Sequence, residues 1–166
     1  AVERIGPGAI SWSTAGRGSV HSERNPDGLG GLARRSHGLQ RWAALAAADE
    51  ETEPGFAHTP AAALPQLEVG GATVRVLIGS AFGESSPVAV RSPMLYLDIA
   101  LAAGDAFPLP PAAERAIYVV DGAVTLDGDA VPPQTCLLYT SPTQQNPEQP
   151  LIPPPLGKKK KIAAST

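Results

Sequence analysis

Short apolar runs, separated by glycine, proline and aspartate, dominate the pattern of hydrophobic and polar positions along this chain. The runs with the clearest preference for extended backbone cover residues 9–12, 74–83 and 94–101. The Asp-Gly pairs at residues 121–122 and 127–128 are typical of hairpin turns. No long stretch shows heptads or sustained helical periodicity. The pattern therefore predicts an all-β protein, either a sandwich or a barrel.

Two further strands are predicted in the first part of the chain. Residues 19–23 (SVHSE) follow the glycine-rich turn AGRG, and residues 39–45 (LQRWAAL) follow a polar, glycine-rich loop. Residues 46–67 are polar and then broken by prolines, which is typical of a connector, with one helical turn expected at residues 47–51.

Composition and charge limit the classes of function. The 166 residues are enough for one domain of ordinary size, and the 17 glycines and 18 prolines favour turns and short strands. The net charge of −3 leaves no electrostatic footprint for direct nucleic-acid binding. The single Cys136 excludes an internal disulfide framework and fits a reducing compartment. With no signal peptide and no apolar run of about 18 residues, we expect a cytoplasmic protein without a membrane segment.

The last part of the chain differs from the rest in composition. All four lysines lie at residues 158–161, and residues 136–166 also concentrate glutamine, asparagine and proline. A basic tail for anionic partners and a disordered end are two readings of such a tract. We favour a third, because CLLYTSP resembles translated sequencing adapter and a lysine run is what a poly-A tract encodes. Residues 136–166 are thus predicted to be a disordered, non-native tail, with Leu151, Ile152 and Leu156 not packed on the body.

The triplet His21-Ser22-Glu23 is the main candidate for chemistry. In an extended strand, residues i and i+2 point to the same face, so an imidazole and a carboxylate can aim at one point. This donor pair suits Fe, Mn, Ni or Zn. The alternative is that both are solvated polar residues on an exposed strand, and the spacing alone does not decide between the two.

The strings TAGRGSVHSERNPDG, HGLQRWAAL, VRVLIGSAFGESSPV and SPMLYLDIAL together resemble the pirin family of the cupin superfamily, collinearly over about residues 5–133. The resemblance implies an incomplete bicupin built from cupin double-stranded β-helix (jelly-roll) barrels. Residues 1–45 then hold the later strands of the N-terminal barrel and residues 46–67 the connector. Residues 68–135 hold the first half of the C-terminal barrel, and residues 136–166 are the tail.

The resemblance also implies a metal site. Pirins hold one divalent transition metal on three histidines and one glutamate, and two of those histidines come from an H-x-H motif upstream of the H-S-E string. By position, His21 and Glu23 match the third histidine and the glutamate. Fe is the expected metal, with Mn, Ni and Zn as alternatives. The sequence contains no H-x-H, so only half of the implied ligand set is present.

The family resemblance leaves two functions open. Some bacterial pirins open the flavonol ring of quercetin with dioxygen, which implies an iron-dependent quercetin 2,3-dioxygenase with a small aromatic substrate. The alternative is a non-enzymatic, metal-dependent regulatory or interaction protein. Both need the same ligands, so the residues do not separate them. A monomer is expected in either case.

The remaining histidines and the cysteine have plainer interpretations. His37 belongs to the string SHGLQRW and is expected in a loop or at a strand edge rather than on the metal. His58 lies in the connector and is expected at the surface or in packing. Cys136 falls at the junction with the tail, so a catalytic thiol is not expected there.

The aromatic and polar candidates also have two readings each. Trp12 and Trp42 are predicted to lie in the barrel core, with an aromatic wall of a substrate pocket as the alternative. Asp98 has no visible metal partner in the sequence. Arg17 and Ser22 either support the ligands or serve as a turn residue and a solvent-facing residue.

Overall fold

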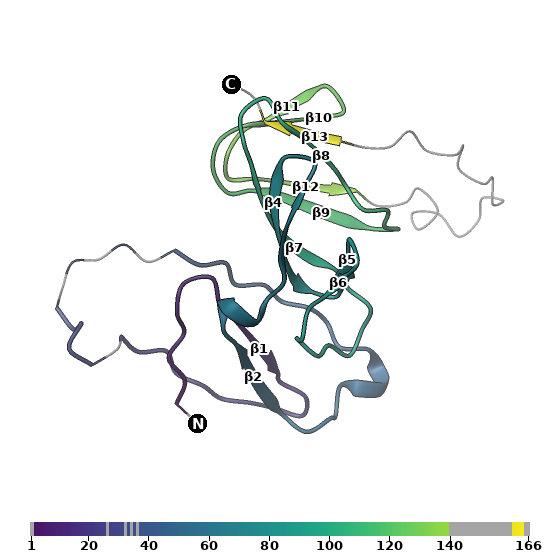
Figure 1. Ribbon diagram of the computed structural model, residues 1–166. Helices are drawn as coiled ribbons and strands as arrows, with labels where there is room; N and C mark the ends of the chain where they lie inside the picture. The colour runs from purple at the N-terminus through teal and green to yellow at the C-terminus, as the bar shows by residue number, and fades with distance from the viewer. Residues whose placement is uncertain are drawn as a thin grey trace. The chain divides into compact units, whose positions relative to one another are not determined.

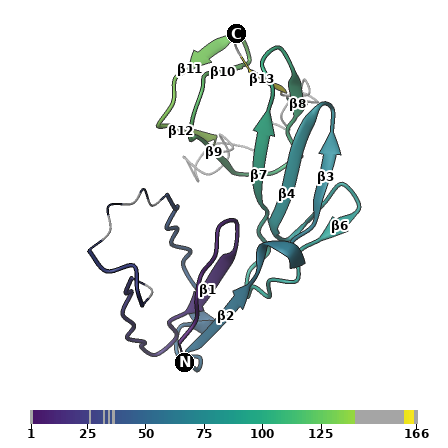
Figure 2. The same cartoon turned by 60° about the vertical axis from the view of Figure 1, so that its left-hand side comes forward.

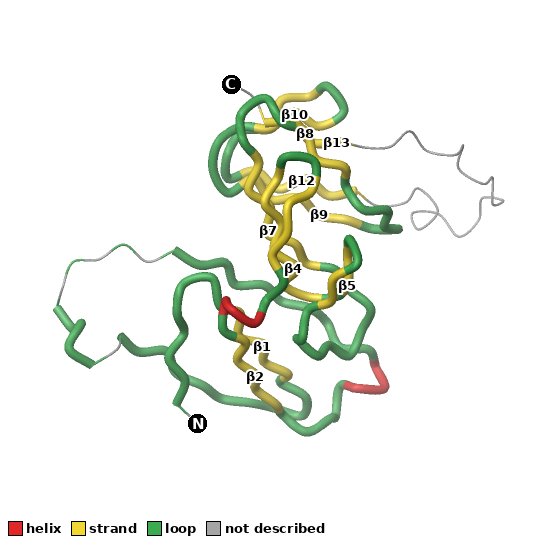
Figure 3. Tube along the Cα trace, viewed as in Figure 1, coloured by secondary structure: helices red, strands yellow, loops and turns green. Residues whose placement is uncertain are grey.

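The computed structural model describes residues 2–25, 27–31, 33, 35, 37–139 and 161–164, which form short β-strands joined by turns and loops (Figure 1). The helices in this part of the chain are two 3-10 turns, η1 (Ala47–Asp49) and η2 (Ala61–Ala63) (Figure 3). No helix among the described residues is long and apolar enough to cross a membrane. The prediction of an all-β fold is confirmed.

The chain divides into two compact units, residues 1–65 with 76–97 and residues 66–75 with 98–166. In the first unit, β1 (Ile10–Thr14) pairs antiparallel with β2 (Gly55–Thr59), which lies inside the predicted connector. A second hairpin joins β5 (Ser80–Ala81) to β6 (Glu84–Ser85). The helical turn expected in the connector is present as η1.

The core of the first unit is small. Leu64, Ile78 and Val88 are buried together. Partly buried apolar side chains cover this cluster, namely Ile10, Trp12, Leu77, Val90, Met94 and Tyr96. Strand β1 thus contributes Ile10 and Trp12 to the same core as the end of β4 and the segment that follows it.

The second unit contains most of the strands. In Figure 2, β3 (Gln66–Val69), β4 (Ala72–Ile78) and β7 (Tyr96–Leu101) lie side by side in one sheet. All of β3, residues 72–75 of β4 and residues 98–101 of β7 belong to the second unit. A two-stranded sheet pairs β9 (Arg115–Val119) with β12 (Thr135–Tyr139). A four-stranded sheet has the order β11-β10-β13-β8. Its strands are β8 (Ala106–Pro108), β10 (Val124–Leu126), β11 (Asp129–Val131) and β13 (Lys161–Ala164).

Strand β4 shows why the sequence pattern succeeds here. Its burial alternates residue by residue, with Ala72, Val74, Val76 and Ile78 buried and the residues between them partly exposed. Alternation with period two places all four buried side chains on one face of the sheet. The β-branched residues in this run also favour the extended backbone.

Two-residue turns with left-handed backbone close three of the hairpins. Gly70 and Gly71 join β3 to β4, Phe82 and Gly83 join β5 to β6, and Asp127 (φ 54°) and Gly128 (φ 98°) join β10 to β11. Positive φ at both central residues is the geometry that matches the twist of paired strands. The predicted hairpin at residues 127–128 is therefore confirmed. Residues 121–122 form a bend between β9 and β10, which do not pair with each other, so the hairpin predicted there is wrong.

The strands predicted at residues 19–23 and 39–45 are wrong, because neither segment is a strand in the structure. A strand needs a neighbour for its backbone N–H and C=O groups. None of the sheets of the described residues contains either segment. Residues with strand-forming composition but without a pairing partner therefore remain irregular here.

The prediction that the chain from residue 136 on does not pack on the body is wrong for its described residues. Cys136 lies opposite Tyr118 in the pairing of β12 with β9, and β13 pairs with both β10 and β8. Backbone pairing depends little on side chains, so a segment of unusual composition can still complete a sheet. Leu151, Ile152 and Leu156 lie outside the described residues, as does the predicted disorder of residues 140–160.

Gly79 offers a test of the first unit. Its φ is 80°, and a Cβ at this position would overlap the carbonyl oxygen of Met94. We expect Gly79→Ala to lower the free energy of unfolding by about 1–3 kcal/mol, because left-handed strain and a backbone clash act together. Gly83→Ala is the matched control, since Gly83 has a similar φ of 84° but nothing within 4 Å of its added Cβ. Urea unfolding of both variants measures the difference, and equal losses would contradict the role given to Met94.

Candidate functional site

His21 and Glu23 lie in an irregular, exposed segment of the first unit, and neither is part of a strand. The neighbouring Val20 is 98% exposed, so the segment does not pack on the core. The argument that i and i+2 share a face assumed a strand, and that assumption does not hold here. The role of His21 and Glu23 as metal ligands stays a prediction.

The donor types and the donor number give different answers on whether this segment fits a metal. An imidazole and a carboxylate are suitable ligands for Fe, Mn, Ni or Zn. Among the described residues, however, no three His, Cys, Asp or Glu side chains come together as a group that could hold a metal ion. Two donors do not make a site, because protein metal centres use at least three or four ligands in fixed geometry. The described residues alone therefore do not fit a resident metal.

The segment that carries His21 and Glu23 is held near its start by Arg17. The Arg17 backbone N–H donates to the carbonyl oxygen of Thr52 at 3.1 Å, and the Arg17 guanidinium forms an ion pair with Glu53. Both charged side chains are more than half exposed, so this ion pair adds little stability. Of the two readings of Arg17, the structure supports the turn residue. Ser22 is exposed, in agreement with its solvent-facing reading.

Farther along, Arg41 lies over the ring of Tyr96, 4.5 Å from its centroid. A cation over an aromatic ring at this distance contributes about 0.5–1 kcal/mol at an exposed site. An arginine next to a tryptophan carries no sequence signal for this contact, because Tyr96 lies far from Arg41 along the chain. The contact anchors the irregular segment a few residues before η1 begins at Ala47.

His58 makes a specific contact that the sequence did not reveal. It lies on β2 directly opposite Ser11 of β1, and its Nδ1 is 3.1 Å from the Ser11 hydroxyl. Both side chains are partly buried. A hydrogen bond across an antiparallel pair fixes the register of the two strands. The expectation of a packing histidine is thus confirmed, with a hydrogen bond added.

The two tryptophans have different environments in the structure. Trp12 packs against the core cluster of the first unit, as predicted. Trp42 is 87% exposed, so its predicted place in a barrel core is wrong for this structure. The reason is that residues 39–45 pair with no strand of the described chain, and an unpaired segment does not hold its side chains against a sheet.

The other candidates are also exposed and lie apart from any ligand group. His37 is exposed and outside the strands, as expected. Asp98 is an exposed position on β7. Cys136 is a free, exposed thiol on β12, opposite Tyr118. None of these residues belongs to a group of metal-ligating side chains among the described residues.

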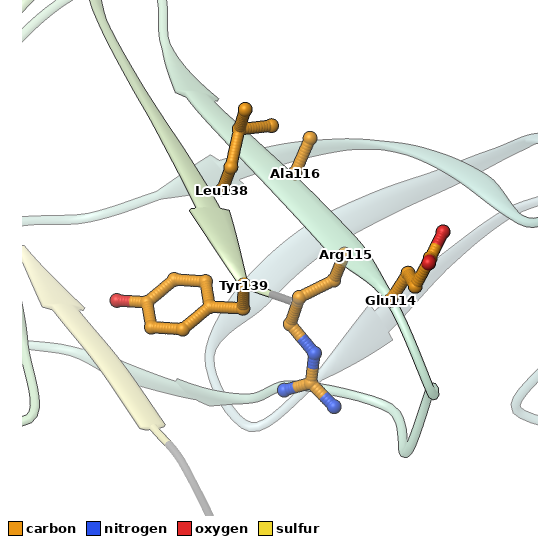
Figure 4. A pocket seen from close by; sticks show the side chains of 5 residues that line it. All are labelled: Glu114, Arg115, Ala116, Leu138 and Tyr139. Atoms are coloured by element: carbon orange, nitrogen blue, oxygen red, sulfur yellow. The ribbon is translucent and has the colours of Figure 1, made fainter. Parts of the chain in front are cut away.

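One open hollow of about 280 Å³ lies in the second unit, between the ends of β9 and β12. Figure 4 shows the side chains that line it, Glu114, Arg115, Ala116, Leu138 and Tyr139. Burial raises the pKa of the Tyr139 hydroxyl, and the carboxylates of Asp127 and Asp129 act in the same direction against Arg115. A tyrosine that stays protonated donates a hydrogen bond but is a poor base. Tyr139 is therefore suited to donate a hydrogen bond in this hollow and not to act as a base.

Comparison with known proteins gives a consistent relationship. The chain is 42% identical over 126 residues to a pirin-like protein of Caulobacter vibrioides, a match that covers 75% of this chain and 43% of the relative. It is 34% identical over 139 residues to a pirin-like protein of tomato, covering 81% of this chain and 46% of the relative. Human pirin is 34% identical over 128 residues, a match that covers 76% of this chain and 42% of the relative. No family model matches the chain.

Two solved structures share the fold. A protein of Geobacillus kaustophilus matches with a TM-score of 0.67 at 21% identity, over 96% of this chain and 60% of the other. A quercetin 2,3-dioxygenase of Acinetobacter baumannii matches with a TM-score of 0.57 at 23% identity, over 75% of this chain and 37% of the other. At these identities the likeness concerns the fold alone.

The strands of the chain and these structural matches define an all-β protein. The sequence matches go further, because several pirins from bacteria, plants and animals align with most of the chain. The chain belongs to the pirin family and spans less than half the length of the curated relatives it matches.

The 166-residue chain by itself should hold a transition metal only weakly. Two exposed donors bring neither the full ligand number nor the fixed geometry on which affinity depends. After loading with Fe²⁺ or Zn²⁺ and exhaustive dialysis, metal analysis should find far less than one metal per chain. Retention of one metal per chain would mean that residues not recognised here complete the site.

Proposed function

We propose that this chain is part of a pirin-like metal-binding cupin that acts as an iron-dependent dioxygenase of the quercetin 2,3-dioxygenase type. The observation that carries the proposal is the sequence match to pirins at 32–42% identity, together with the H-S-E string at residues 21–23. The quercetin 2,3-dioxygenase of Acinetobacter baumannii supports it at the level of fold.

In this proposal His21 and Glu23 are ligands in the full-length protein, and the remaining ligands come from residues outside these 166. A divalent transition metal, when bound, supplies Lewis-acid chemistry toward the oxygens of a flavonol and toward dioxygen. Imidazole and carboxylate leave further coordination positions free for such ligands. We expect Fe, with Mn, Ni and Zn as alternatives, and a monomeric, cytoplasmic protein, in line with the lone Cys136.

A second candidate is a regulatory protein whose surface responds to the bound metal. It is supported by the relatives with higher identity, which are called pirins or pirin-like proteins and not quercetin 2,3-dioxygenases. The two candidates share the ligands and differ only in turnover. A substrate assay therefore separates them, and a metal assay does not.

The ligand assignment is tested in the full-length protein. Removing a residue that only supports a metal ligand typically lowers metal affinity by about 10–100-fold. We expect His21→Ala and Glu23→Ala, which remove the ligands themselves, each to lower the affinity by more than this. His37→Ala is the control, because His37 is equally exposed and is given no ligand role. Isothermal titration with Fe²⁺ under anaerobic conditions measures all three. Unchanged affinity in both ligand variants would contradict the assignment.

The reaction is tested with quercetin and dioxygen on the same protein. We expect loss of the flavonol absorbance with consumption of one O₂ per quercetin, abolished by His21→Ala and by chelation of the metal. Full metal occupancy without any turnover would instead favour the regulatory candidate.

A further inference from the structure

The sheet of the second unit contains a slot between β8 and β10 that a distant segment fills. In the order β11-β10-β13-β8, strands β8 and β10 are not neighbours, and β13 lies between them (Figures 1 and 2). Strand β13 runs antiparallel to both. Without it, one edge of β8 and one edge of β10 would have unpaired backbone N–H and C=O groups.

The slot has one register position at which the facing residues of both neighbouring strands are buried. Phe107 of β8 and Leu126 of β10 both lie opposite position 162, and their exposed fractions are 0% and 2%. Directly opposite residues in an antiparallel pair share a face of the sheet. A strand that fills the slot should therefore carry an apolar residue at this position, and the sequence has Ile162 there. The flanking positions on β8, Ala106 and Pro108, are exposed.

We infer that the slot between β8 and β10 is a strand-acceptor site, which binds an extended peptide through backbone pairing on both sides. Its occupant in this chain is the chain's own segment Lys161–Ala164, held as an internal ligand. Backbone hydrogen bonds give such sites their affinity, and a pocket for alternate side chains gives them their selectivity. A segment of unusual composition can fill the site because only one register position lies opposite buried residues of both neighbouring strands.

The first test empties the slot in the full chain and offers the segment as a separate peptide. Ala163 lies opposite Ala106 on one side and Thr125 on the other, so Ala163→Pro removes a backbone donor in the middle of β13. A fluorescent peptide KKKKIAAST, residues 158–166, should bind this variant saturably by fluorescence anisotropy. It should bind at least tenfold more weakly to Ala163→Val, which keeps the donor and hence the internal strand.

Two control peptides separate pairing from charge. KKKKNAAST has the same charge but no apolar residue for position 162, and KKKKIAPST loses the backbone donor at position 164, the last residue of β13. Both should bind the Ala163→Pro variant at least tenfold more weakly than KKKKIAAST. Equal binding of KKKKIAAST and KKKKNAAST, or no binding of any peptide, would overturn the inference.

A second test needs no emptied slot and so decides the matter if Ala163→Pro does not fold. In a Cys136→Ser background, Thr125→Cys with Ala163→Cys joins two directly opposite positions, whose Cβ atoms lie about 4.5–5.5 Å apart in such pairs. Thr125→Cys with Ala164→Cys is the matched control, since it is one residue out of register and on the opposite face. Mild oxidation should give an intramolecular disulfide only in the first pair. Equal cross-linking of both pairs, or a disulfide between two chains, would overturn the assignment of the internal occupant.

Discussion

Pairing of backbone groups between segments far apart in the sequence decides which parts of this chain are ordered into strands. Strand β1 finds its partner in β2 some forty residues later, and β9 finds its partner in β12. Residues 19–23 have a comparable composition but no partner among the described residues, and they remain irregular. Because an unpaired strand leaves its N–H and C=O groups to water, side-chain preference alone does not hold it extended.

The same constraint bears on the candidate metal ligands. Convergence of donors on one point requires that each donor be fixed on a paired element, as strands of a closed barrel provide. His21 and Glu23 lie instead on an exposed segment that is tied down through Arg17 at one end and through Arg41 farther along. Their chemistry suits a transition metal, while their present surroundings do not fix a geometry. The chain spans less than half the length of its pirin relatives, so the complete activity remains a proposal.

The need for backbone pairing also explains the strand-acceptor slot, where two strands lack each other as partners. Strands β8 and β10 carry Phe107 and Leu126, which belong to the buried core of the second unit, yet they are not hydrogen-bonded to each other. The space between them has the width of one strand, and β13 fills it. Unpaired strand edges present backbone N–H and C=O groups that can pair with another chain, and native proteins often cover such edges with a segment of their own.

The sequence by itself determined the features that depend on neighbours along the chain. The apolar run at residues 74–83 predicted a strand, the Asp127-Gly128 pair predicted a hairpin turn, and the pirin strings predicted the family. Only the tertiary structure decided which strand-like segments are paired. It left Trp42 exposed, placed His58 against Ser11 and seated β13 between β8 and β10. The physical reason is that periodicity and turn conformation are local properties, whereas a hydrogen-bonded partner is supplied by a segment that no local pattern identifies.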